Sequence, residues 1–309
     1  MTEELHVVLG ATGAIGKAVA AELDARGHRV RTVSRGAATG PHHVQADITT
    51  TDGAIAACQG AAVVYQCAQP RYERWVAEFP ALIRTVLAGV EAAGAKLVMA
   101  DNLYVYGPVD GPMTEDLPHA AANPKGRVRA EVDELILDAH RSGRIRATLG
   151  RASDYYGPSG VNTILGPTVF AAALAGKTAR WVGDLDQPHT VAYLPDIAAG
   201  LATLGERAEA DGRGWHLPAA EAITGREFLG LVRTAAGGKP KIAGLGRGAQ
   251  RLIGLFNPTV RELGETWYQR DRPFIADDSA FQKAFGPVKV TPHDEGVATT
   301  LDWFRHNAA

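Results

Sequence analysis

Short apolar runs alternate with longer amphipathic stretches through the first half of the chain. The apolar runs contain few polar positions, which is typical of strands buried on both faces. The longer stretches repeat apolar residues three and four positions apart, which predicts helices that bury one face. Alternation of strands and helices predicts an α/β fold with a parallel, doubly wound sheet, whose ligand binds at the carboxyl ends of the strands. The predicted strands are 5–9, 29–33, 43–46, 62–67, 96–100 and 145–149, and the long predicted helices are 71–93 and 125–142.

The pattern of the second half is less regular. Thr224 and Glu227 form a capping box that predicts the start of a helix ending near residue 237. We expect a Rossmann-type domain over 1–158 and a smaller mixed lobe over 159–309 that binds the substrate, with segments around 178–207 returning to the sheet. The other predicted helices are 161–175, 195–204, 248–256, 259–268 and 293–306, and the short predicted strands are 179–182, 190–193 and 215–217.

Three glycines follow the first predicted strand at a spacing of three residues. Glycine lets a pyrophosphate approach the backbone, and the free N–H groups at the start of the next helix bind phosphate. The spacing is a variant of the fingerprint for dinucleotide binding, and a glycine-rich turn at the start of a domain is the alternative interpretation. The residues expected at the cofactor are Gly10, Thr12, Gly13, Ala14, Ile15 and Gly16.

The end of the second predicted strand indicates which dinucleotide binds. An acidic residue there would select NAD through the ribose hydroxyls, but the chain has Ser34 and Arg35. A guanidinium pairs with a 2′-phosphate, so the pattern favours NADP, with a surface arginine as the alternative. Asp47, followed by Ile48, ends the third strand; its carboxylate either accepts a hydrogen bond from adenine or caps the turn at 49–51.

Several motifs together resemble the short-chain dehydrogenase/reductase superfamily, in its extended branch of NAD-dependent epimerases and dehydratases. The resemblance implies that Ala68 and Gln69 line the nicotinamide ribose, and that Ala152 and Ser153, after the sixth strand, also contact the cofactor. The motifs are the glycine turn, Cys67-Ala68-Gln69, Val105-Tyr106-Gly107, Arg151 with Tyr156-Gly157-Pro158, and Asp196.

The chain departs from this family where its chemistry takes place. Asn102, Lys125 and Arg129 stand at the positions of the family's Ser, Tyr and Lys, so the chain is identified as an atypical member without the Tyr-x-x-x-Lys motif. Lys125 and Arg129 share one helix face. Arg129 is a permanent cation suited to the ribose hydroxyls, whereas Lys125 can donate a proton or polarise a carbonyl and is also expected to contact the cofactor.

Two other side chains complete the catalytic hypothesis. The Asn102 amide can hydrogen-bond a substrate oxygen, and Tyr104 is the alternative acid. The competing interpretation is a solvated basic helix start without chemistry, or a packing tyrosine. Aromatic and imidazole side chains that we expect around the substrate are Tyr72, Trp75, His189, Trp267 and Tyr268.

Composition narrows the possible partners. The 309 residues carry a net charge of −2, which gives no reason to expect nucleic acid or an anionic membrane as a partner. The sequence shows neither an apolar run of membrane length nor a signal peptide, and Cys58 and Cys67 form no paired motif, so we expect a cytoplasmic protein. No cluster has metal-ligand spacing. A homodimer through 71–93 and 125–142 is also expected, with Leu87 and Leu137 as interface positions.

These observations lead to one main functional hypothesis and two alternatives. The main hypothesis is an NADP(H)-dependent oxidoreductase of the carbonyl reductase or alcohol dehydrogenase type, acting on a small-molecule substrate. The first alternative is a nucleotide-sugar epimerase or dehydratase, as in much of the extended branch. The second alternative is a protein that senses NADP without catalysis.

Overall fold

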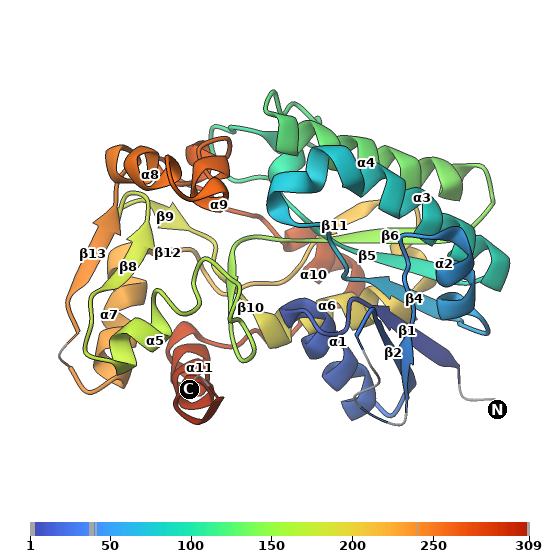
Figure 1. Ribbon diagram of the computed structural model, residues 1–309, viewed down its shortest axis with the longest axis horizontal. Coiled ribbons are helices and arrows are strands. Elements are labelled where there is room, and N and C mark those ends of the chain that lie inside the picture. The colour runs from blue at the N-terminus through green and yellow to red at the C-terminus, as the bar shows by residue number, and fades with distance from the viewer. Residues whose placement is uncertain (1–3, 37–39, 41, 239, 308–309) are drawn as a thin grey trace.

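The central element of the computed structural model is a parallel sheet of seven strands in the order β11-β6-β5-β4-β1-β2-β3 (Figure 1). The structure describes residues 4–36, 40, 42–238 and 240–307. The order reverses between β1 and β4, which creates the switch point at which ligands of this architecture bind. The strands are β1 (Leu5–Leu9), β2 (Arg29–Ser34), β3 (His43–Gln45), β4 (Val63–Gln66), β5 (Lys96–Asn102), β6 (Arg146–Ala152) and β11 (Gly214–His216).

Helices cover both faces of this sheet, as the alternating pattern predicts. One face carries α2, α3 and α4, and the other carries α1, α6 and α10, each with its own apolar core (Figure 1). The α/β Rossmann-type prediction is confirmed. The helices are α1 (Ala14–Ala25), α2 (Thr51–Cys58), α3 (Trp75–Ala93), α4 (Pro124–Arg141), α6 (Leu194–Glu206) and α10 (Ser279–Phe285).

A third apolar core lies away from the sheet, around Tyr156, Phe170, Trp181, Phe228 and Phe304. It belongs to the smaller group of elements on the left of Figure 1. This group contains α5 (Phe170–Leu174), α7 (Gly225–Ala235), α8 (Arg247–Gly254), α9 (Pro258–Glu262), α11 (His293–Asn307), and the paired strands β8 (Ala179–Val182) with β13 (Ile242–Leu245), β9 (Pro188–His189) with β12 (Ile223–Thr224), and β7 (Tyr155–Tyr156) with β10 (Ala192–Tyr193). The boundary at residue 158 and the substrate-binding role of the lobe stay predictions.

Several sequence predictions for this half are wrong in detail. The predicted helix 161–175 is helical only at Phe170–Leu174, because Gly160 and Gly166 place turns before it. The predicted helix 259–268 stops at Glu262, before Gly264. Within 178–207, the strands β8, β9 and β10 pair inside the lobe, whereas α6 packs on the central sheet, and β11 is the later strand that joins that sheet. The capping box of Thr224 and Glu227 forms as predicted.

The arrangement of α3 also changes the dimer argument. Leu87 is 4% exposed and lies in the core shared with the sheet, so it offers no free interface. Leu137 is half-buried against the same core. The expected homodimer therefore loses one of its two supporting positions and stays a prediction.

Candidate active site

The glycine turn between β1 and α1 has the geometry of a phosphate cradle. Gly10 has φ of +76°, and a Cβ there would lie 2.6 Å from the Ala68 backbone, so both strain and contact require glycine. A Cβ at Gly16 would lie 2.9 Å from the Ala11 Cα. At Gly13, by contrast, a Cβ would meet only the Gly10 carbonyl, at 3.4 Å.

Gly13 is also the N-cap of α1 and provides no side-chain cap for the first turn. The N–H groups of Ala14, Ile15 and Gly16 therefore lie at the positive end of a helix, as an anion site requires. This turn fits a pyrophosphate, because Gly13 leaves space beside these donors and Gly10 fixes the loop against Ala68. The structure thus provides the cradle that the sequence predicts, while Thr12 is an exposed residue beside it.

The end of β2 provides cationic and hydroxyl groups but no acid. Ser34 Oγ lies 3.1 Å from His43 Nε2, and Arg35 is exposed. Asp47 Oδ1 accepts hydrogen bonds from Thr49 N at 3.1 Å and Thr49 Oγ1 at 2.7 Å. These bonds lower the pKa of Asp47, so the carboxylate stays charged in its turn. Of the two roles considered for Asp47, the structure shows the cap.

Ile48 contributes through packing at this edge. Its side chain is buried, and its carbonyl accepts a hydrogen bond of 2.6 Å from Thr85 Oγ1. This bond joins the loop after β3 to α3, so the segment that carries Asp47 is held against the sheet.

Arg129 lies at the carboxyl ends of β4 and β5 and is 1% exposed. Its Nη1 donates to Asp101 Oδ1 at 3.0 Å and its Nη2 donates to Gln69 Oε1 at 3.1 Å. The guanidinium stacks on the Trp75 ring at 4.2 Å. Its buried Nε has no hydrogen-bond partner, which leaves one donor for a ligand.

Lys125 is equally buried, but it is held by a different part of the chain. Its Nζ lies 2.8 Å from Glu262 Oε2 in α9 and donates to the Tyr72 carbonyl at 2.9 Å. The ammonium also lies 4.2 Å from the Tyr72 ring centre. Its backbone N–H donates to Glu265 at 3.3 Å. The alternative of a solvated basic helix start is therefore wrong for Lys125 and Arg129, although Arg127 between them is exposed.

The other predicted catalytic residues line the same region. Asn102 Oδ1 accepts a hydrogen bond from Tyr104 N at 3.0 Å, and the Tyr104 ring lies 6.0 Å from Trp75. Burial raises the pKa of Tyr104 well above its ordinary value, with Tyr72 and Asp154 adding to the effect. Tyr104 is thus a neutral phenol near pH 7, able to donate a proton but not to act as a base.

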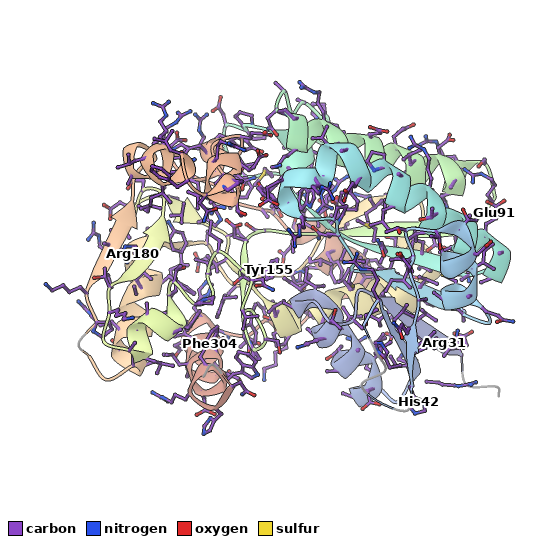
Figure 2. All side chains as sticks on the ribbon, in the orientation of Figure 1. Arg31, His42, Glu91, Tyr155, Arg180 and Phe304 are labelled. Atoms are coloured by element: carbon purple, nitrogen blue, oxygen red, sulfur yellow. The ribbon has the colours of Figure 1, made fainter. Side chains whose placement is uncertain are left out.

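The cofactor residues after β6 adjoin this group. Ala152 pairs in register with Asn102 across β5 and β6. Ser153 follows it, and its buried Oγ has no hydrogen-bond partner, so it is free to bind a ligand. In Figure 2, Tyr155 lies near the middle of the molecule, between the central sheet and the smaller lobe. Burial raises the pKa of Tyr155 to about 12.

Sequence reasoning missed the buried acids beneath this site. Asp101 Oδ2 accepts a hydrogen bond from Arg151 Nε at 3.3 Å as well as the bond from Arg129, and Arg151 also pairs with Asp133. Burial raises the pKa of Asp133 well above its ordinary value, and the Asp101 charge raises it further. An acid at a strand end, next to Asn102, is the sequence signal that could have identified Asp101.

A second buried cluster joins the sheet to the lobe. Asp154 pairs with Arg270 and lies 3.0 Å from His189 Nε2. Burial alone would raise the pKa of Asp154, but the neighbouring Arg270 and His189 outweigh it and lower the pKa. His189, which we expected around the substrate, therefore lies beside Asp154. Trp267, expected there too, is buried. The sequence gives no signal for this cluster, because its members lie far apart along the chain.

Within the described ranges, no group of three or more His, Cys, Asp or Glu side chains is placed to hold a metal ion. Burial raises the pKa of Cys58 and of Cys67 to about 12, so both thiols stay protonated near pH 7.

Comparison with known proteins identifies the family. The model of the NAD dependent epimerase/dehydratase family matches residues 6–217, and the chain belongs to this family. Its structure also resembles that of MoeE5 in complex with UDP-glucose and NAD, with a TM-score of 0.80 and 21% identity over 98% of this chain and 99% of that one. At this level of identity, the structural likeness shows the shared fold.

Two curated relatives show the range of activities among similar sequences. A 3beta-hydroxysteroid-dehydrogenase/decarboxylase from Arabidopsis thaliana is 23% identical over 86% of this chain and 52% of its own length. A dTDP-glucose 4,6-dehydratase from Streptomyces antibioticus is 22% identical over 80% of this chain and 71% of its own length. The chain thus spans about half the length of the first relative. Members of this family are NAD-dependent epimerases and dehydratases, and the dehydratases among these relatives fit the epimerase/dehydratase alternative better than a carbonyl reductase.

Proposed function

We propose that the protein binds a nicotinamide dinucleotide and transfers a hydride at an alcohol or carbonyl carbon of a small-molecule substrate. The observation that carries this proposal is the cradle at Gly13, beside the uncapped first turn of α1. Arg129, Gln69 and Ser153 lie at the carboxyl ends of strands in the same sheet, where the other half of a dinucleotide would reach.

A bound nicotinamide would supply or accept the hydride. The protein itself must bind the ribose of the cofactor and transfer a proton to or from the substrate oxygen. Arg129 keeps a free Nε and a contact to Gln69, which suits the hydroxyls of a ribose. The Lys125 ammonium is the proton donor in this proposal: on reduction it gives a proton to the substrate oxygen, and Glu262 holds the amine in place.

The Lys125 contacts determine how this step begins. Nζ is engaged by Glu262 and by the Tyr72 carbonyl, so it must give up one of these contacts to reach a substrate oxygen. The carbonyl contact is the weaker one, because Glu262 carries the opposite charge. Oxidation of an alcohol would run this step in reverse: Lys125 begins as the neutral amine, and its Nζ takes up the hydroxyl proton and becomes the ammonium.

We propose a nucleotide-linked sugar as the first substrate class to test, because similar curated sequences include dTDP-glucose 4,6-dehydratases. An apolar ketone or alcohol is the second class. The ring pairs of Trp75 with Tyr72, at 4.9 Å, and with Tyr104, at 6.0 Å, favour it because they offer an apolar surface beside Lys125.

We also propose NADP rather than NAD as the cofactor. Support comes from Ser34 and Arg35 at the end of β2, where NAD-specific proteins have an acid. The nearby carboxylate of Asp47 already accepts a hydrogen bond from Thr49. The structure of MoeE5 carries NAD, so the preference needs its own test. Replacing Arg35 with Leu should reduce NADP affinity at least tenfold and leave NAD affinity within twofold, whereas exposed Arg29→Leu should change neither.

Substrate profiling tests the function. Purified protein is incubated with NADP or NAD and a panel of nucleotide-linked sugars, ketones and alcohols, and products and cofactor absorbance are followed together. Turnover of a nucleotide-linked sugar supports the first substrate class, and turnover of an apolar ketone supports the second. Tight dinucleotide binding with no turnover in either panel would contradict catalysis and favour the sensing alternative.

A further inference from the structure

Helix α8 exposes its large apolar side chains and buries an amide, unlike an ordinary surface helix. Gln250 is 3% exposed, and its Nε2 donates to the Val260 carbonyl at 2.7 Å. Leu252, by contrast, is 65% exposed, and Leu255 and Phe256, directly after the helix, are 72% and 87% exposed. Surface helices normally bury the apolar side chains and expose the amides, so this helix needs another apolar partner.

The exposed apolar side chains are concentrated here. In the part of the chain that the structure describes, seven large apolar side chains are exposed, and four of them lie between residues 252 and 256. Single exposed apolar residues are ordinary, but four within five positions form a patch. Figure 1 places α8 at the outer edge of the smaller lobe, away from the central sheet.

The segment of sequence that carries this patch has only positive charges. Residues 228–261 contain no Asp or Glu, although the whole chain has a net charge of −2. Arg247, Arg251 and Arg261 are exposed beside the apolar side chains. The other cations of the segment are Arg233, Lys239 and Lys241. Although the chain as a whole is nearly neutral, the surface formed by this segment is both basic and apolar.

We propose that residues 247–257 form a docking surface for an anionic lipid bilayer. Apolar side chains enter the boundary between headgroups and acyl chains, and arginines pair with lipid phosphates and carboxylates. No helix in the described ranges is long and apolar enough to cross a membrane, so the contact is peripheral. This inference does not depend on the proposed function.

A second copy of the chain fits this surface less well. A two-fold contact would place the patch against itself and bring Arg247 and Arg251 of both copies together. Like charges oppose that contact, whereas an anionic bilayer complements them. The combination of cationic and apolar side chains therefore favours the lipid surface.

The docking surface is connected to the candidate active site. Gln250 bonds the backbone of α9, and Glu262 at the end of α9 pairs with Lys125. Asn257 between the two helices caps α9 by accepting a hydrogen bond from Val260 N at 3.2 Å. Docking on a bilayer would hold the segment that covers Lys125 close to the lipid surface.

Vesicle co-sedimentation tests the proposal with the full-length protein. The probes are vesicles of phosphatidylcholine alone and vesicles with about one-third phosphatidylglycerol, each at low and high salt. We expect the protein to sediment with the anionic vesicles at low salt and to be released by high salt, because exposed charges are screened. No sedimentation with anionic vesicles at low salt would overturn the proposal.

Two variants separate the apolar and cationic contributions. Leu255→Ser with Phe256→Ser should abolish binding to anionic vesicles. Arg247→Gln with Arg251→Gln should weaken it about 30-fold, as expected for two cations at a membrane surface. Unchanged binding by either double variant would overturn the proposal.

Matched controls remove similar groups elsewhere on the surface. Val76→Ser with Val161→Ser removes two exposed apolar side chains, and Arg29→Gln with Arg146→Gln removes two exposed cations. Both controls should bind vesicles like the unaltered protein. Sedimentation velocity distinguishes a protein interface: a dimer that dissociates on Leu255→Ser with Phe256→Ser, without vesicle binding, would overturn the lipid assignment.

Discussion

Glu262 Oε2 lies 2.8 Å from the Nζ atom of Lys125, although the two residues are separated by most of the second half of the chain. Lys125 stands at the start of α4, at the position where the family resemblance predicts tyrosine, and Glu262 ends α9 of the smaller lobe. The ammonium is buried with an opposite charge beside it, which a neutral phenol would not require. The lysine at this position is thus paired with a carboxylate from the smaller lobe.

Replacing Lys125 with Met should lower kcat/KM at least 100-fold for the substrate that the panel identifies, because it removes the proposed proton donor while keeping an unbranched side chain. Dinucleotide affinity should change less than threefold. Steady-state kinetics with calorimetric titration separates the two effects. Arg127→Met on the exposed side of the same helix start is the control and should retain activity. Full activity in Lys125→Met would rule out the proton-donor role.

Replacing Glu262 with Gln should destabilise the protein, because the buried Lys125 ammonium loses its opposite charge. The carboxylate is 20% exposed, so the expected loss is about 1–3 kcal/mol, below that of a fully buried pair. Urea unfolding measures it, with the exposed Glu221→Gln as the control. A stability equal to that of the control would show that the pair does not stabilise the fold.

His6 predicts a loss of stability in mild acid. His6 is 1% exposed, and its ring centre lies 4.1 Å from that of His28 in a tilted arrangement. Burial and then the His28 charge lower the pKa of His6 from 6.5 to about 4. Below pH 6.5 the unfolded chain binds a proton at His6, whereas the folded protein does not. The contribution of His6 to the free energy of unfolding is therefore fully present above pH 6.5 and is lost as the pH falls toward 4. We expect a loss of about 1–3 kcal/mol across this interval.

Urea unfolding at several pH values measures this loss. His6→Gln should flatten the dependence on pH between 6.5 and 4, whereas the exposed His306→Gln should leave it unchanged. A His6→Gln variant with the same pH dependence as the unaltered protein would assign the acid sensitivity to other groups.

The sequence predicts the central sheet well because its signals are local. Apolar runs identify the six strands before residue 152, and helical spacing identifies α3 and α4. Gly10 and Gly13 act through their own backbone and nearest neighbours, so their roles are also visible in the sequence. The short α2 escaped prediction because alanine, glycine and threonine give it little amphipathic pattern.

The candidate site is only partly predictable, since its electrostatic partners come from distant segments. Lys125 and Arg129 share a helix face as expected, but each pairs with its own acid, Glu262 and Asp101. No periodic pattern predicts that α9 approaches α4. The same limit applies to Asp154 and Arg270, which meet across 116 positions of sequence.

The central claim, that a dinucleotide binds at the start of α1, is tested most directly by calorimetric titration of Gly13→Ala with NADPH and NADH. A Cβ at Gly13 meets only the Gly10 carbonyl at 3.4 Å, so the variant should fold, whereas Gly10→Ala should fail because its Cβ would lie 2.6 Å from Ala68. We predict one saturable dinucleotide site in the unaltered protein and at least tenfold weaker binding in Gly13→Ala at an unchanged melting temperature, because the methyl group fills the phosphate cradle. Absence of dinucleotide binding to the unaltered protein, or equal affinity in a folded Gly13→Ala, would contradict the account.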